Sequence, residues 1–143
     1  KVILLAPLMT VIGGQGGNAT MQAVTVVVRS LALGQINGKN VSKVIAKEVG
    51  VSSLNGLAIG TFAAILVYSY TQRAGIAFCM FTGLVSNMFI AGLVGSMLPV
   101  LLRAFRLDPA LAAGPIATTF TDMCGFSVFL GVATFLIGKF GGL

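Results

Sequence analysis

Residues 109–138 read PALAAGPIATTFTDMCGFSVFLGVATFLIG, and Asp122 is the one charged side chain in this run. A bilayer-spanning helix needs about 20 apolar residues, so this stretch is long enough to cross a membrane. The whole chain of 143 residues is similar, with 57% hydrophobic and 8% charged residues and a mean hydropathy of +1.02. Soluble domains carry about 25% charged residues. The composition predicts an all-α integral membrane protein and excludes a soluble enzyme or a nucleic-acid binder, despite the net charge of +6.

The charged residues divide the chain into four spans, at about residues 2–28, 49–72, 76–102 and 109–138. We therefore expect a single transmembrane domain over residues 1–143. The connectors at 29–48 and 103–108 hold most of the Lys and Arg residues, and the positive-inside rule places them in the cytoplasm. Both chain ends then lie outside a cell (plasma) membrane. Because no signal peptide precedes the first span, we expect a further span before Lys1.

The first span contains the sequence GGQGGNAT at residues 13–20. Four glycines and two amides weaken a helix, so we expect the helix to be broken here. Irregular backbone at membrane depth is tolerated only against protein or a water-filled cavity, and its free carbonyls can bind ions. A tight helix-packing patch is the alternative. Further along, Asn18, Gln22, Thr25 and Arg29 share one helical face and form a polar stripe.

The same stretch also matches a dinucleotide-binding pattern, G-x-G-x-x-A, from Gly14 to Ala19. A Rossmann site needs an acidic residue about 20 positions further on and a βαβ unit, and this chain offers neither. We therefore reject a dinucleotide site.

Small residues in the second and third spans predict close helix packing. Gly56 and Gly60 are four residues apart, and the third span has the same spacing at Gly83, Asn87, Ala91 and Gly95. Pro99 predicts a kink or a helix stop near the end of the third span. The two cysteines, Cys79 and Cys124, lie in apolar runs and are expected to be buried, reduced thiols.

Asp122 lies about 21 Å from Asp108 along a helix that rises 1.5 Å per residue, which is near mid-bilayer. An ionised carboxylate there costs about 2.5–3.5 kcal/mol, so it is either protonated or compensated by a cation. Such a residue indicates a functional site by default. The alternative is a neutral carboxyl that is hydrogen-bonded to a neighbouring helix. Thr118 and Gly125 lie one turn to either side of Asp122, with Thr121 beside it.

Three blocks of sequence resemble the transmembrane domain of the MgtE magnesium transporter family. They are GGNATMQ at 16–22, LVGSMLP at 93–99 and GPIATTFTD at 114–122. The resemblance implies a homodimer of five-helix subunits with an ion path at the dimer axis, in which this chain supplies the second to fifth helices. The family's first helix and its cytoplasmic N and CBS domains have no counterpart in the sequence.

The same resemblance implies that Asp122 binds hydrated magnesium, helped by the main-chain carbonyl of Thr118. It also implies that Gly14, Gly17 and Asn18 line the path. Two residues depart from the family's pattern, because Met21 and Gly114 stand where asparagines are usual, which removes two oxygen ligands. The full set of expected path-lining residues is Gly14, Gly16, Gly17, Asn18, Met21, Gln22, Gly114, Thr121 and Gly125.

We therefore expect a dimeric magnesium channel or transporter in which Asp122 from both subunits holds the ion. Magnesium is the transported substrate, and no organic cofactor, nucleic-acid partner or enzymatic activity is expected. One alternative is a proton- or sodium-coupled divalent cation exchanger of the same family. Two others from different classes are an enzyme acting on lipid headgroups, which would need several clustered acidic ligands, and a purely structural membrane subunit.

Overall fold

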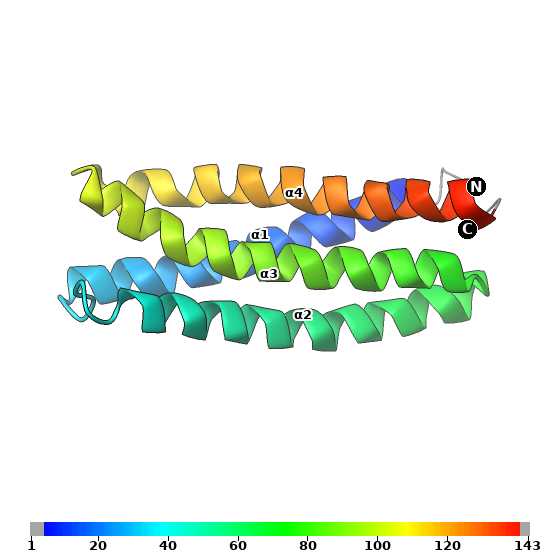
Figure 1. The fold of residues 1–143 in the computed structure, drawn as a ribbon, viewed down its shortest axis with the longest axis horizontal. Helices are drawn as coiled ribbons and strands as arrows, with labels where there is room; N and C mark the ends of the chain where they lie inside the picture. The colour runs from blue at the N-terminus through cyan, green and yellow to red at the C-terminus, as the bar shows by residue number, and fades with distance from the viewer. Residues whose placement is uncertain (1–4, 141–143) are drawn as a thin grey trace.

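The structure, a computed structural model, describes residues 5–140. It contains four α-helices: α1 (Leu5–Ala32), α2 (Val41–Thr71), α3 (Ala74–Ala104) and α4 (Pro109–Phe140). Successive helices run in opposite directions, so the α1–α2 and α3–α4 connectors lie at one end of the bundle (Figure 1). The start of α1, the α2–α3 turn and the end of α4 lie at the other end. The prediction of an all-helical fold is confirmed for these residues.

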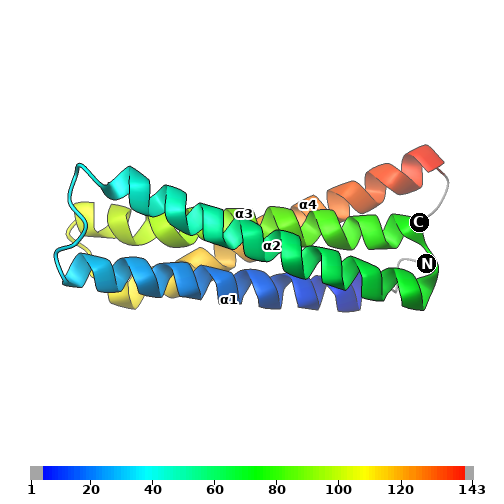
Figure 2. The same cartoon turned by 90° about the horizontal axis from the view of Figure 1, so that it is seen from below.

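Helix α3 is the centre of the bundle. It packs against each of the other three helices, whereas α1 and α2 touch at only a few positions. Figure 2 views the bundle from below, with α2 in front of α3 and α4 behind it. Accordingly, α3 has a buried residue at almost every turn, from Ile76 to Leu102, while α2 buries only Glu48, Ser52, Gly56 and Gly60.

Small residues bring α2 close to α3, as their spacing predicts. A Cβ built on Gly56 would lie 2.8 Å from the Cβ of Met88, and one built on Gly92 would lie 2.7 Å from the Cβ of Ser52. Both distances are shorter than side-chain carbons tolerate, so only glycine fits at these two positions. Because lipid tails are as apolar as the helices themselves, such close van der Waals packing is what holds helices together in a bilayer.

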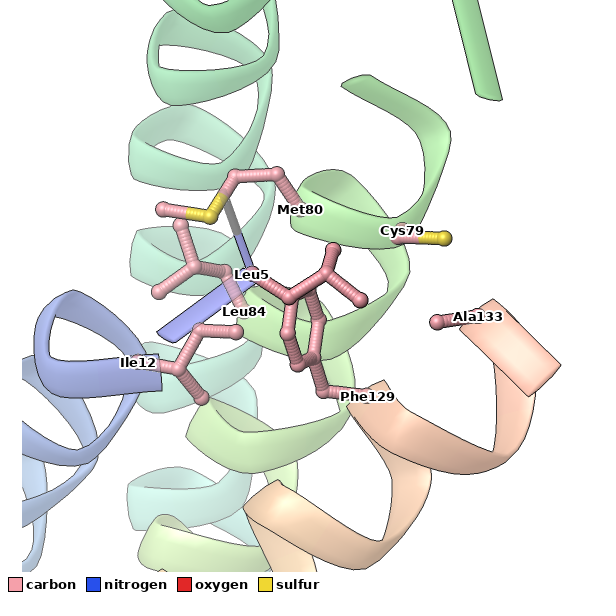
Figure 3. Close-up of a cluster of buried hydrophobic side chains, with 7 residues drawn as sticks. All are labelled: Leu5, Ile12, Cys79, Met80, Leu84, Phe129 and Ala133. Atoms are coloured by element: carbon pink, nitrogen blue, oxygen red, sulfur yellow. The ribbon is translucent and has the colours of Figure 1, made fainter. Parts of the chain in front are cut away.

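An apolar cluster fills the space between α1, α3 and α4 near the end that holds the start of α1. Figure 3 shows Ile12 of α1 and Phe129 of α4 converging on α3 beside Leu84. The two side chains meet over Gly83, where a Cβ would lie 2.9 Å from Ile12 Cδ1. Cys79 belongs to this cluster as a buried free thiol, as expected, whereas Cys124 is free but only half-buried.

The prediction that the first helix is broken by its glycine-rich segment is wrong. Residues 13–20 are continuous helix within α1. Glycine costs a helix about 1 kcal/mol relative to alanine, but tertiary contacts can offset that cost. Here the contacts are close ones to α3 and α4, because Gly13 and Gly16 lie directly against side chains of these helices. The alternative interpretation, a helix-packing glycine patch, holds for Gly13 and Gly16 but not for Gly14 and Gly17, where an added Cβ would have nothing within 4 Å.

Among the described residues, α2, α3 and α4 are long and apolar enough to cross a membrane. Helix α1 is not among these candidates, because its glycines and amides lower its hydropathy below that of the other three. The first span, at 2–28, therefore remains a prediction, and its residues 2–4 lie outside the described part of the chain. If α1 does cross the membrane, its polar groups must face protein or water rather than lipid.

Several helix ends differ from the expected span limits, and α1 already continues to Ala32, beyond the expected limit at residue 28. Helix α2 begins at Val41, well inside the expected connector at 29–48, and α3 continues through Pro99 to Ala104 rather than stopping there. Arg103 near the end of α3 donates a 2.7 Å hydrogen bond from Nη1 to the carbonyl of Leu31. The same carbonyl also accepts a 3.2 Å hydrogen bond from the backbone N–H of Gly34, and a cation at this C-terminus of α1 is favoured by the helix dipole.

A matched pair of glycines in α2 tests the packing account. We expect Gly56→Ala to destabilise the protein by about 1–3 kcal/mol, because the new methyl group overpacks against Met88. Gly50→Ala is the control, since Gly50 is exposed and a Cβ there would have nothing within 4 Å. Thermal unfolding of the purified protein in detergent measures both changes. Equal melting temperatures for the two variants would contradict the close α2–α3 contact.

Candidate functional site

Asn87 of α3 is a fully buried amide at the point where α1, α3 and α4 meet. Its Nδ2 donates a 2.8 Å hydrogen bond to the carbonyl oxygen of Ile12 in α1. This bond fixes the orientation of the amide, because a carbonyl can only accept and the reversed amide would place two acceptors together. The other atom of the amide, Oδ1, is buried and has no hydrogen-bond partner among the described residues.

Two glycines make room for this amide. Gly16 of α1 lies on one side, so close that a Cβ there would overlap Asn87 Nδ2. Gly125 of α4 lies on the other side, where a Cβ would come within 2.6 Å of Asn87 Oδ1. The nitrogen of the amide is therefore turned toward α1, whereas the amide group as a whole lies against Gly125 of α4. Gly16 and Gly125 are both buried.

Asp122 lies one helical turn before Gly125 on α4 and is half-buried. Its Oδ1 is buried and, like the oxygen of Asn87, has no hydrogen-bond partner within residues 5–140. A Cβ built on Gly13 of α1 would lie 3.3 Å from this oxygen and 3.0 Å from Cζ of Phe126. The glycine segment of α1 thus packs directly against the carboxylate. The alternative prediction, a carboxyl hydrogen-bonded through this oxygen to a neighbouring helix, has no support here.

A chain of hydroxyl groups joins α1 to α4 on the connector side of Asp122. The Thr20 hydroxyl lies 2.8 Å from the carbonyl oxygen of Gly16 and 3.2 Å from Thr121 Oγ1. Thr121 in turn donates to the main-chain carbonyl of Thr118 at 2.9 Å. Both Thr20 and Thr121 are fully buried. The Thr118 carbonyl, the second expected ion ligand, therefore accepts a hydrogen bond from a buried hydroxyl within the same helix.

The polar stripe predicted for the first span lies on the open face of α1. Asn18, Gln22, Thr25 and Arg29 are all exposed, on the side of the helix away from α3. Gly14 is exposed on the same face one turn before Asn18. If α1 lies within a membrane, this row of amides and hydroxyls cannot face lipid hydrocarbon without a large desolvation cost, so the face would require water or another protein surface beside it.

The two positions that depart from the family's pattern are in contact with each other. A Cβ built on Gly114 of α4 would lie 3.0 Å from Sδ of Met21 in α1. The Met21 side chain is otherwise exposed, and the glycine beneath it is buried. A large thioether on one helix therefore fits over the missing side chain on the other. No pattern in the sequence indicates that these two residues touch.

The structure separates the expected site residues into two groups. The first group consists of residues on α1 and α4 that are exposed or half-buried: Gly14, Gly17, Asn18, Met21, Gln22, Thr118 and Asp122. Those buried in contacts within the same chain are Gly16, Gly114, Thr121 and Gly125. Sequence reasoning assigned Asn87 only a role in helix packing, although an amide in an otherwise apolar span is the signal that could have identified it.

The donor set is made of hard oxygen atoms: one carboxylate, helix carbonyls, hydroxyls and amides. Among residues 5–140, no three His, Cys, Asp or Glu side chains gather into a metal-binding cluster. The acidic residues Glu48, Asp108 and Asp122 lie far apart along the helices, which does not favour the lipid-headgroup enzyme. Oxygen ligands of this kind suit a cation such as magnesium that retains most of its water.

Comparison with known proteins is consistent with this chemistry. A family model described as MgtE, divalent cation transporter, matches residues 9–132. The magnesium transporter MgtE of Thermus thermophilus is 35% identical over 136 residues, which is 95% of this chain and 30% of that protein. The magnesium transporter MgtE of Bacillus subtilis is 29% identical over 137 residues, 96% of this chain and 30% of that protein. The chain thus spans about 30% of the length of these relatives.

A pair of glycines in α4 tests the geometry around Asn87. We expect Gly125→Ala to lower stability by about 1–3 kcal/mol, because the added methyl group collides with the buried amide. Gly131→Ala in the same helix has open space around it and should be neutral or stabilising by up to about 1 kcal/mol. Thermal unfolding in detergent gives both values. A Gly125→Ala protein as stable as the Gly131→Ala protein would show that Asn87 does not occupy this gap.

Proposed function

Because this chain belongs to the MgtE family of divalent cation transporters, we propose that it moves magnesium across the cell membrane, with Asp122 as the residue that holds the ion. The family consists of transporters and not of enzymes. The observation that carries the proposal is the carboxylate of Asp122. It lies midway along an apolar helix, and its buried Oδ1 has no hydrogen-bond donor in the described part of the chain. A cation that arrives from solution would supply the missing charge.

The exposed polar face of α1 supports a path made by two copies of the chain. One protomer offers a single carboxylate at this depth, which is a weak site for a divalent ion. A two-fold axis beside α1 would duplicate Asp122 and cover the stripe from Asn18 to Arg29 with a second protein surface. Magnesium gives up its water reluctantly, so two carboxylates with carbonyls and amides around them would suit a largely hydrated ion. Gly14, Gly17 and Asn18 would line the approach to it.

The distribution of charge supports an orientation. Arg29, Lys39 and Arg103 lie at the end of the bundle that holds the α1–α2 and α3–α4 connectors. The positive-inside rule places that end in the cytoplasm, and the start of α1 and the end of α4 outside. An inside-negative membrane potential would then drive the ion inward, with about 4.6 kcal/mol for a double charge at 100 mV. The Met21–Gly114 contact brings a thioether rather than an amide oxygen to the path, which would alter selectivity among divalent ions.

Substitution of Asp122 tests the proposal. We expect Asp122→Asn to reduce magnesium uptake by more than about 10-fold. Even the mutation of residues that only hydrogen-bond to a metal ligand typically lowers metal affinity or activity about 10- to 100-fold. Asp108→Asn is the matched control. Asp108 is exposed and accepts a hydrogen bond from the backbone N–H of Ala110, which asparagine can also accept at a helix start. Uptake of magnesium into proteoliposomes under a fixed membrane potential measures both. Wild-type uptake by Asp122→Asn would refute the role of Asp122, and no ion flux in the full-length wild type would favour the structural subunit.

A coupled exchanger is the second candidate, because the buried Oδ1 of Asp122 could accept a proton as well as a cation. In that case Asp122 would alternate between the two. Uptake at a fixed membrane potential should then change when a pH or sodium gradient is imposed, whereas a channel driven by potential alone should not respond. Proteoliposomes with defined internal and external buffers separate the two mechanisms, and Asp108→Asn again serves as the control.

A further inference from the structure

Along the interface of α3 with α1 and α4, the buried side chains change from apolar to polar at Asn87. One turn before it on α3, Gly83 is covered by Ile12 and Phe129, which are apolar. Two turns after it, Gly95 lies against the backbone and Cβ groups of α1 at Thr20 and Ala23. Between these layers, the space left by Gly16 and Gly125 is filled by a carboxamide instead of a hydrocarbon side chain.

A carboxamide in this position lowers the stability of the fold. Its Oδ1 has no hydrogen-bond partner in the described helices, and burying such an acceptor costs about 1–3 kcal/mol. Leucine has a similar size and branching and would fill the same gap without that cost. A residue that breaks a local rule of packing without an evident gain in stability marks a functional position. What the amide adds is one directional bond, from its Nδ2 to the carbonyl of Ile12.

That bond fixes α1 at the position where α1 contacts the carboxylate. Ile12 directly precedes Gly13, and Gly13 is the residue packed against Asp122 Oδ1. On the other side, the same amide group lies against Gly125, one turn after Asp122 on α4. The Asn87 side chain therefore fixes the position of the glycine segment along the axis of α1, and it also separates that segment from α4.

We propose that Asn87 is a positioning residue for the ion site, which holds Gly13 over Asp122 and so keeps the carboxylate in its place between α1 and α4. The inference rests on the proposed role of Asp122 in binding the ion. Asn87 itself touches neither the ion nor its water. Displacement of a reacting group by about 1 Å can cost 100-fold in function, so a small drift of α1 is enough to matter.

Variants of Asn87 test this role through the affinity for magnesium. In the full-length protein in proteoliposomes, we expect Asn87→Leu to raise the half-saturating magnesium concentration about 10-fold, with a smaller change in the maximal uptake rate. Asn87→Ser, which is too short to reach Ile12 and cannot overpack, should have the same effect if the leucine variant fails to fold. Asn55 is exposed on α2, and Asn55→Leu and Asn55→Ser are the matched controls.

Hydrogen exchange provides a second measurement that does not depend on transport. Faster exchange in residues 10–20 of the Asn87 variants, together with the loss of affinity, is the expected result. Faster exchange with wild-type affinity would mean that Asn87 only supports the fold, and wild-type exchange would mean that it does not hold α1. Either result overturns the proposal. Wild-type affinity in Asp122→Asn would instead refute the proposed function, so the two failures can be told apart.

Discussion

Close approach of the helices to α3 is the constraint on which the rest of the structure depends. Glycines at the contact points let backbones and side chains meet at distances that a Cβ would forbid, as at Gly16, Gly56, Gly92 and Gly125. In a bilayer, where apolar side chains gain little by leaving lipid, this packing supplies the association energy that burial supplies in water. The same approach encloses the amide of Asn87 between two glycines and brings α1 directly against Asp122.

The helices themselves could be predicted from the sequence because apolar runs and charged interruptions have a simple physical meaning in a membrane. The stripe from Asn18 to Arg29 and the packing role of Gly56 and Gly60 followed from helical spacing alone. The break expected in α1 was wrong because helix propensity describes a chain without neighbours. Gly16 is poor in an isolated helix, but it is required beside Asn87.

The candidate site could be predicted only in part for a related reason. Asp122 could be identified because a single charged residue in an apolar run is visible in the sequence without knowledge of its contacts. Asn87 did not stand out, since its importance comes from three residues on two other helices, at Ile12, Gly16 and Gly125, which only the folded chain brings together. The contact of Met21 with Gly114 is of the same kind. Long-range pairs of this sort leave no periodic trace in a single sequence.

The central claim is that Asp122 holds a magnesium ion on a path shared by two copies of the chain. A cryo-electron microscopy structure of the full-length protein with magnesium tests it most directly. We predict ion density between the Asp122 carboxylates of two protomers, about 2.1 Å from their oxygens if bound directly or about 4 Å if bound through water. A structure in which Asp122 faces lipid, or is hydrogen-bonded to a neighbouring helix with no ion density beside it, would contradict the account.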